Sequence, residues 1–100
     1  MIHPEIKRGL IKPGTESGVA LGFVADKFKG YLWRRGDMIF ISMIESKIPA
    51  HGHFSGLLAE IEDMGFNVHV PNPVPLMQKI LTKKGFQGQW TARGPVWSRA

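Results

Sequence analysis

The expected architecture rests on residues 38–70, which read MIFISMIESKIPAHGHFSGLLAEIEDMGFNVHV. The run from Met38 to Glu45 is apolar at nearly every position, which predicts a strand buried on both faces at the centre of a sheet. Apolar residues then recur at the spacing of one helix face, at Phe54, Leu57, Leu58, Ile61 and Met64. Gly65 ends this helix, and FNVHV alternates apolar and polar residues as a short strand does. A strand, a helix and a strand in this order predict a parallel pair joined by a right-handed crossover.

The flanking segments extend this unit into an open mixed sheet. Upstream, turn signals at Asp26-Lys27 and at Arg35-Gly36-Asp37 divide residues 19–46 into three antiparallel strands, and residues 1–18 predict a short strand and an irregular loop. Downstream, a second helix runs from Pro75 to about Lys84 and stops at Gly85. The tail FQGQWTARGPVWSRA predicts two short strands about a turn. The inward residues expected on the second helix are Leu76, Met77, Ile80 and Leu81.

Length and composition fit one domain, residues 1–100, of the α/β (α+β) class, with a mostly antiparallel sheet and two main helices in the order meander, helix, strand, helix, hairpin. The chain has 100 residues, 43% of them hydrophobic, and no cysteine, which excludes disulfides, thiolate metal sites and a cysteine nucleophile. The longest apolar run, MIFISMI, is far shorter than the roughly 20 residues of a membrane span, and MIHPEIKRG lacks the hydrophobic region of a signal peptide. We therefore expect a cytoplasmic protein with no membrane association.

The formal net charge of +5 favours an acidic partner, which is a nucleic acid, an acidic protein face or a phosphate-rich cofactor. Aromatic and basic residues are interleaved, as in proteins that bind single-stranded nucleic acid, although strand aromatics more often serve packing. No recognised RNA or DNA module motif is present. The residues concerned are Phe28, Tyr31, Trp33, Trp90 and Trp97, with Lys27, Lys29, Arg34, Arg35, Arg93 and Arg99.

The turn at residues 48–56 admits three interpretations. His51 and His53 could face the same way, but zinc needs three or four ligands, and no further candidate stands at a typical spacing, so no metal is expected. A buried strand that turns at Gly52 into a helix presents unpaired backbone N–H groups and the positive end of the helix dipole, which attract phosphate. Neither the P-loop pattern nor the dinucleotide fingerprint is present. An ordinary turn without a ligand explains this stretch equally well.

The order of elements, the run 38–65 and the later VPNPVPLMQKILTKKGF together resemble the core of the GNAT acyl-CoA N-acyltransferases, over about residues 19–90. In that family the turn pattern Gln/Arg-x-x-Gly-x-Gly/Ala and the following helix hold the pyrophosphate of acetyl-CoA. Here Pro49 stands at the Gln/Arg position, Gly52 at the first Gly and Phe54 at the second small residue, so only Gly52 keeps the pattern. Asn72 in the later loop and Gly85-Phe86 after the second helix also match.

The resemblance implies acetyl-CoA, or a related acyl-CoA, as the cofactor. Backbone amides around Ile44 to Ser46 would pair with the pantetheine arm, and Lys47 or His51 could add charge beside the pyrophosphate. The expected cofactor-binding residues are Ile44, Ser46, Gly52, His53, Phe54, Ser55 and Asn72.

The implied reaction is direct attack of an amine on the thioester carbonyl while a base removes a proton. Glu45 is the candidate base, with His51 or His53 as alternatives, although a solvated carboxylate at a strand end is the simpler reading of Glu45. The tyrosine that in many members protonates the leaving thiolate corresponds to Leu81, which has no proton to give. Residues 1–18 replace two helices that wall the acceptor site, so that site is open or completed by another chain, as in a homodimer.

Three functions are therefore carried forward. The first is a GNAT-like N-acetyltransferase that acts on a protein lysine, an N-terminus or a small amine. The second is a catalytically silent, GNAT-shaped interaction module, of the kind encoded by phages to act on a host protein. The third is a small basic nucleic-acid-binding protein.

Overall fold

The computed structural model of the chain describes residues 6–48 and 52–99. Within these residues the elements are β1 (Gly9–Ile11), α1 (Glu16–Leu21), β2 (Phe28–Arg35), β3 (Met38–Ser46), α2 (His53–Asp63), β4 (Asn67–Pro71), α3 (Pro75–Lys83), β5 (Gln87–Thr91) and β6 (Gly94–Ser98). None of the helices in this part of the chain is long and apolar enough to cross a membrane.

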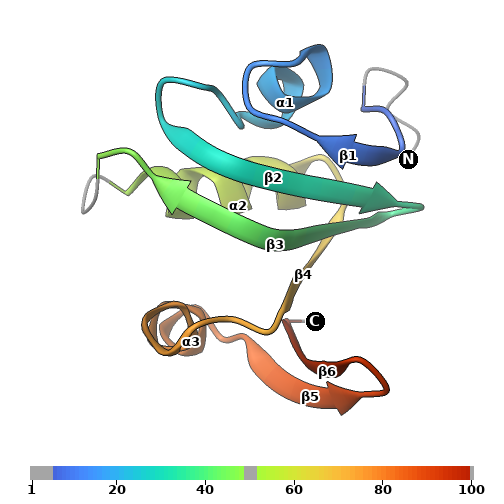
Figure 1. Cartoon of the computed structure of the whole chain (residues 1–100), viewed down its shortest axis with the longest axis vertical. Coiled ribbons are helices and arrows are strands. Elements are labelled where there is room, and N and C mark those ends of the chain that lie inside the picture. The colour runs from blue at the N-terminus through green and yellow to red at the C-terminus, as the bar shows by residue number, and fades with distance from the viewer. Residues whose placement is uncertain (1–5, 49–51, 100) are drawn as a thin grey trace.

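The six strands form one sheet in the order β1-β2-β3-β4-β6-β5 (Figure 1). The pair β3 and β4 is parallel and is joined by α2, whereas the other neighbouring strands are antiparallel. The prediction of a mixed, mostly antiparallel α+β architecture with a terminal hairpin is therefore confirmed. β3 lies inside the sheet, as its apolar sequence predicts.

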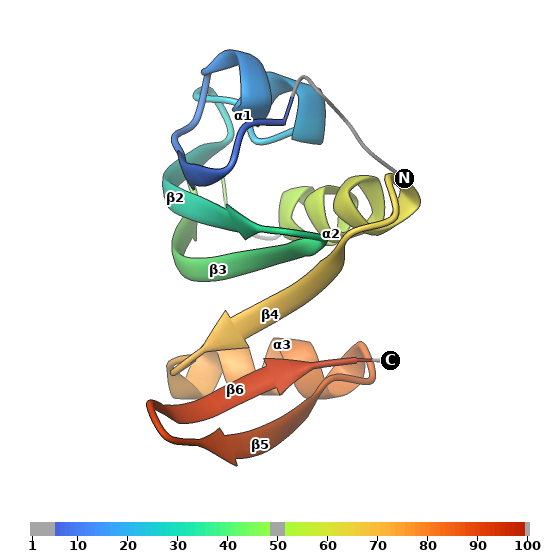
Figure 2. The same ribbon diagram turned by 90° about the vertical axis from the view of Figure 1, so that its right-hand side faces the viewer.

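The core lies between the sheet and the helices. α2 contacts both β3 and β4, and α1 contacts α2 in turn (Figure 2). Hydrophobic burial at this interface is the main source of stability. The side chains that meet there include Leu32, Ile39 and Ile41 of the strands and Leu57, Leu58 and Ile61 of α2, each at most 2% exposed.

The opposite face of the sheet has no helix over it among the described residues, so the prediction that β3 is buried on both faces is wrong. Ile39 and Ile41 are buried, but Met43 is 63% exposed. Tyr31 and Trp33 of β2 share this uncovered face, where they are 37% and 46% exposed. Apolar composition marks these strands as β structure, but it does not report how many faces a second layer covers.

The N-terminal region contains a helix that the sequence reading missed. Residues 19–25 were expected to be a strand, but the first strand of the meander is β1, and α1 lies between β1 and β2. Thr15 caps α1 by accepting a hydrogen bond from the Gly18 amide, and Gly22 closes the helix with a left-handed φ of 84°. A helix of six residues spans less than two turns, too few to show a helical period.

A bulge in β3 shapes the centre of the sheet. Leu32 is opposite Ile41 and Tyr31 is opposite Met43, so Ser42 is the extra residue in the β2–β3 ladder. A bulge bends its strand and increases the local twist. The last parallel pair between β3 and β4 is Phe40 with His69, and beyond it the two strands diverge (Figure 1).

Arg99 ties the C-terminal segment to two helices. Its Nε donates a hydrogen bond of 2.9 Å to Oε2 of Glu62 in α2, and Nη1 donates to the Lys84 carbonyl after α3. The guanidinium also lies 4.9 Å from the centre of the Phe86 ring. The hydrogen bond with Glu62 raises the pKa of Arg99 above its usual high value, so this side chain stays charged at every physiological pH.

We expect Arg99→Gln to lower the free energy of unfolding by about 1–2 kcal/mol, because it removes the partly exposed hydrogen bonds to Glu62 and to the Lys84 carbonyl together with the cation–π contact. Urea denaturation measures the change. Arg93→Gln is the matched control, expected to stay within about 0.5 kcal/mol of the parent, because the guanidinium of Arg93 has no partner among the described residues. Equal stability of the two variants would contradict this role of Arg99.

Candidate functional site

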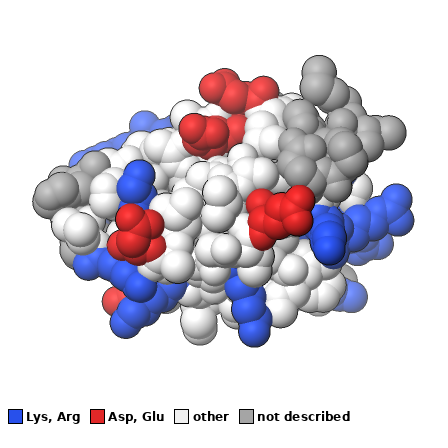
Figure 3. All heavy atoms as spheres, turned by 90° about the horizontal axis from the view of Figure 1, so that it is seen from above, with Lys and Arg blue, Asp and Glu red and all other residues white. Residues whose placement is uncertain are grey.

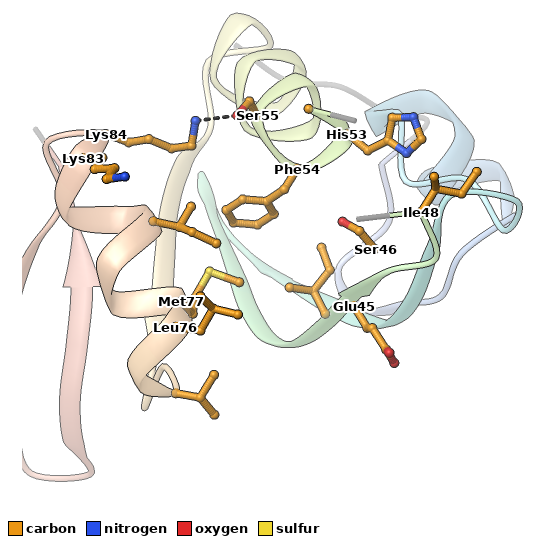
Figure 4. A pocket seen from close by; sticks show the side chains of 14 residues that line it. Glu45, Ser46, Ile48, His53, Phe54, Ser55, Leu76, Met77, Lys83 and Lys84 are labelled. Carbon is orange, nitrogen blue, oxygen red and sulfur yellow. Dashed lines mark hydrogen bonds between the residues drawn. The ribbon is translucent and has the colours of Figure 1, made fainter. Parts of the chain in front are cut away.

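A cavity of about 610 Å³ opens where the end of β3, the start of α2 and one side of α3 meet (Figure 4). Most of the residues that the sequence singled out come together here. Those that line the cavity are Ile44, Glu45, Ser46, Gly52, His53, Phe54 and Ser55.

The end of β3 contributes a free strand edge. Residues 43–46 pair with β2 on one side, but no described strand pairs with them on the other, because β4 has already diverged. The Ile44 side chain lies on the covered face and lines the cavity. A ligand with amide groups could therefore pair with this edge as an additional strand does.

The start of α2 contributes an anion-binding geometry. Gly52 is the N-cap residue with a left-handed φ of 72°, and the first turn holds no acidic residue. The first bond of the helix joins the Gly56 amide to the Gly52 carbonyl at 3.0 Å, so the amides of Phe54 and Ser55 precede the ladder. A serine or aspartate cap usually satisfies such amides, and here an anion could do so.

Two lysines at the end of α3 face this helix start. Lys84 Nζ donates a hydrogen bond to Ser55 Oγ, and Lys83 lies beside it in the cavity wall (Figure 4). A cation beside a helix N-terminus is unfavourable by itself, because the helix dipole is positive at that end. The combination of lysines and helix amides is suited to a ligand with more than one negative charge.

The side of α3 that faces the cavity is apolar, and this corrects the expected orientation of the helix. Leu76 was expected to point inward, but it is 70% exposed and lines the cavity with Met77 and Ile80. Leu81 is the α3 residue that is fully buried. An exposed apolar wall opposite Ile44 is suited to the uncharged part of a ligand.

Glu45, the predicted catalytic residue that the structure describes, does not point into the cavity. The Glu45 carboxylate points away from the space between α2 and α3 in Figure 4, and Glu45 is opposite Lys29 in the ladder, which puts it on the uncovered face. The His53 ring packs edge-on against Phe28, with ring centres 6.4 Å apart, so His53 can offer a ligand its backbone rather than its imidazole. His51 lies outside the described residues.

Asn72, the remaining predicted cofactor residue, is not placed with the others. It has a positive φ of 48°, its amide donates to the Pro95 carbonyl at 2.9 Å, and its side chain lies beside Gly94. It lines a separate groove on the uncovered face of the sheet.

That second groove has a volume of about 880 Å³, and sequence reasoning did not predict it. Phe40 and His69 lie in it with ring centres 5.4 Å apart, at the last β3–β4 pair. His69 therefore lies at the point where the strands part. In residues 29–35, Tyr31, Trp33 and Arg35 alternate with residues of the covered face, and this alternation was the sequence signal for the groove. The other principal residues of the groove are Tyr31, Trp33, Arg35, Ser42 and Arg93.

Among residues 6–48 and 52–99, no three histidine, aspartate or glutamate side chains are grouped so that they could hold a metal ion. Comparison of the chain with known proteins found no matching family model, curated protein or solved structure.

Proposed function

We propose that the chain binds acetyl-CoA, or a related acyl-CoA, in the cavity between β3, α2 and α3 and transfers the acyl group to an amine. The observation that carries the proposal is the meeting of an uncapped helix start with Lys84, which donates to Ser55 of that same helix turn. Two positive features without an intervening carboxylate favour a pyrophosphate between them.

The rest of the cavity fits the remaining parts of such a ligand. The free edge of residues 44–46 offers backbone groups to the two amides of a pantetheine arm, and the apolar wall of Leu76 and Met77 offers contact to its carbon chain. The thioester would then lie along β3, near the bulge at Ser42. A backbone N–H of this strand could polarise its carbonyl.

In the proposed reaction the neutral amine attacks the thioester carbon, a C–N bond forms and the C–S bond breaks. A proton leaves the amine nitrogen to a base or water, and the CoA thiolate takes a proton from solvent. Glu45, on the uncovered face, remains the proposed base. Leu81, at the position of the family's tyrosine, has no acidic proton to give, but a thiol with a pKa of about 8.5 is a good leaving group without an acid.

The test is titration of the chain with acetyl-CoA by calorimetry, followed by detection of released CoA thiol in the presence of an amine. The chain has no cysteine, so a thiol reagent reports CoA alone. We expect binding and amine-dependent thiol release. Absence of binding at millimolar acetyl-CoA would refute the proposal, and binding without release for every amine would indicate the silent interaction module instead.

The lysines of the cavity allow a finer prediction. We expect the double variant Lys83→Gln and Lys84→Gln to weaken acetyl-CoA binding about tenfold at low salt, because a charge-assisted contact with phosphate is worth about 1.5–3 kcal/mol when well formed. Calorimetry measures the change. The double variant Lys12→Gln and Lys79→Gln removes the same two charges from exposed positions that do not line the cavity. Equal losses in the two variants would show that only net charge matters.

A further inference from the structure

We propose that the groove on the uncovered face of the sheet binds an amine that also carries a carboxylate or a phosphate, next to an apolar or aromatic part. The inference rests on the proposed function, since this amine would be the acyl acceptor. The proposed acceptor is thus narrowed from any lysine side chain, N-terminus or small amine to an amine that carries an anionic group.

The charge of the groove is the first reason. Arg35 and Arg93 line it, and no aspartate, glutamate or lysine is among the described residues that do. Neither guanidinium has a partner in the part of the chain that the structure describes. Arg34, by contrast, is held by the Gly36 carbonyl at 2.9 Å. Two unpaired arginines without a neighbouring carboxylate attract an anion and repel a polyamine or a basic peptide.

The surface between the arginines is the second reason. Tyr31 and Trp33 project from β2 into the same groove that holds the Phe40 and His69 rings. Exposed aromatic side chains in a concave site bind flat or apolar groups, and the volume of about 880 Å³ is in the range of small-molecule sites. The groove therefore suits a ligand of the size of an amino acid or a dipeptide.

The position of the groove is the third reason. Phe40 and His69 form the last β3–β4 pair, so the groove contains the point where these strands part. The acyl-CoA cavity includes the continuation of β3 on the covered face. An amine in the groove and a thioester along the β3 edge would therefore approach the same opening between the strands from opposite faces.

The groove offers two arginines for contacts with an anion, which favours a small anionic amine over a nucleic acid. Seen from the α1 end of the molecule, acidic side chains are interspersed with lysines and arginines (Figure 3). The net charge of +5 is thus not gathered into one continuous basic surface on that side. A nucleic acid needs several phosphate contacts along its backbone, whereas a single carboxylate or phosphate needs only the two arginines.

The test compares two probes with the same ring and amine, L-phenylalanine, which has a carboxylate, and 2-phenylethylamine, which lacks it. Each is titrated calorimetrically into the full chain, alone and with saturating CoA. We expect phenylalanine to bind at least about tenfold more tightly in one of these conditions, since a charge-assisted arginine contact supports a difference of that size. The double variant Arg35→Gln and Arg93→Gln should lose this preference, and the double variant Arg8→Gln and Lys12→Gln, which removes two positive charges outside the groove, should retain it.

Equal binding of the two probes, or tighter binding of spermidine, would overturn the proposal. Salt-dependent binding of oligo(dT) that the double variant loses, together with equal binding of the two amines, would assign the groove to nucleic acid instead. The amine titrations require no acyl transfer. If the chain prefers phenylalanine but does not bind acetyl-CoA, the groove's selectivity is supported and the acyltransferase proposal is refuted. If it binds acetyl-CoA but binds both amines equally, the acyltransferase proposal stands and the proposal for the groove is refuted.

Discussion

Replacement of Gly52 with leucine is expected to lower the affinity for acetyl-CoA at least about a hundredfold, in a chain that still folds. Gly52 lines the cavity at the start of α2, and a Cβ on it would meet no atom of a described residue within 4 Å. The leucine side chain would therefore enter the space where the pyrophosphate meets the helix amides. The left-handed φ of 72° at position 52 strains the backbone of a leucine by about 1–2 kcal/mol, which a domain of ordinary stability tolerates.

Gly65→Leu is the matched control for this experiment. Gly65 follows the other end of α2, has a φ of 90°, and likewise has no described atom within 4 Å of its would-be Cβ. The two variants thus carry similar backbone strain, but only the leucine at position 52 lies at the cavity. Calorimetry should show normal affinity for Gly65→Leu, and a similar loss in both variants would mean that helix stability, not occupation of the cavity, controls binding.

Gly30→Ala is expected to have the largest effect on stability, a loss of more than about 4 kcal/mol or failure to fold. A Cβ at this position would lie 2.1 Å from the Met43 carbonyl oxygen and 2.8 Å from its carbon, and the φ of 110° is strained for any other residue. Because the obstacle is backbone, no side-chain rotation relieves it. Gly30 is opposite Ile44 in the ladder, so the substitution should also displace the strand edge at the cavity.

Gly36→Ala provides the comparison. Gly36 lies in the turn between β2 and β3 with a φ of 61° and no described atom within 4 Å of the added carbon. Only backbone strain of about 1 kcal/mol is expected there. Urea denaturation followed by circular dichroism measures both variants, and a Gly30→Ala chain as stable as Gly36→Ala would contradict the close β2–β3 approach.

The parts of the fold that could be predicted are those with long local patterns. The apolar stripe of α2 ends at Gly65, and α3 begins at Pro75 and stops before Gly85, so both helices and the strand between them follow from sequence. The six residues of α1 are too few to show a period. The exposure of Met43 depends on whether a second layer covers the sheet, which no local pattern reports.

The candidate site could be predicted only in part for the same reason. Residues 44–46 and 52–55 are close in sequence, and one turn motif located them together. The contact of Lys84 with Ser55 joins residues 29 positions apart, and the groove brings Arg35 next to the β5–β6 hairpin. Such associations depend on tertiary topology. The divergence of β3 from β4 beyond Phe40 lies next to the bulge at Ser42, and neither feature has a sequence signature here.

Backbone amide NMR during titration with acetyl-CoA tests the central claim most directly, because it reports both binding and its location. The account predicts saturable shifts of the amides of residues 44–46 and of Phe54 and Ser55, at the β3 edge and the α2 start. Absence of binding at millimolar acetyl-CoA, or shifts confined to Tyr31, Trp33 and the rest of the uncovered face, would contradict it.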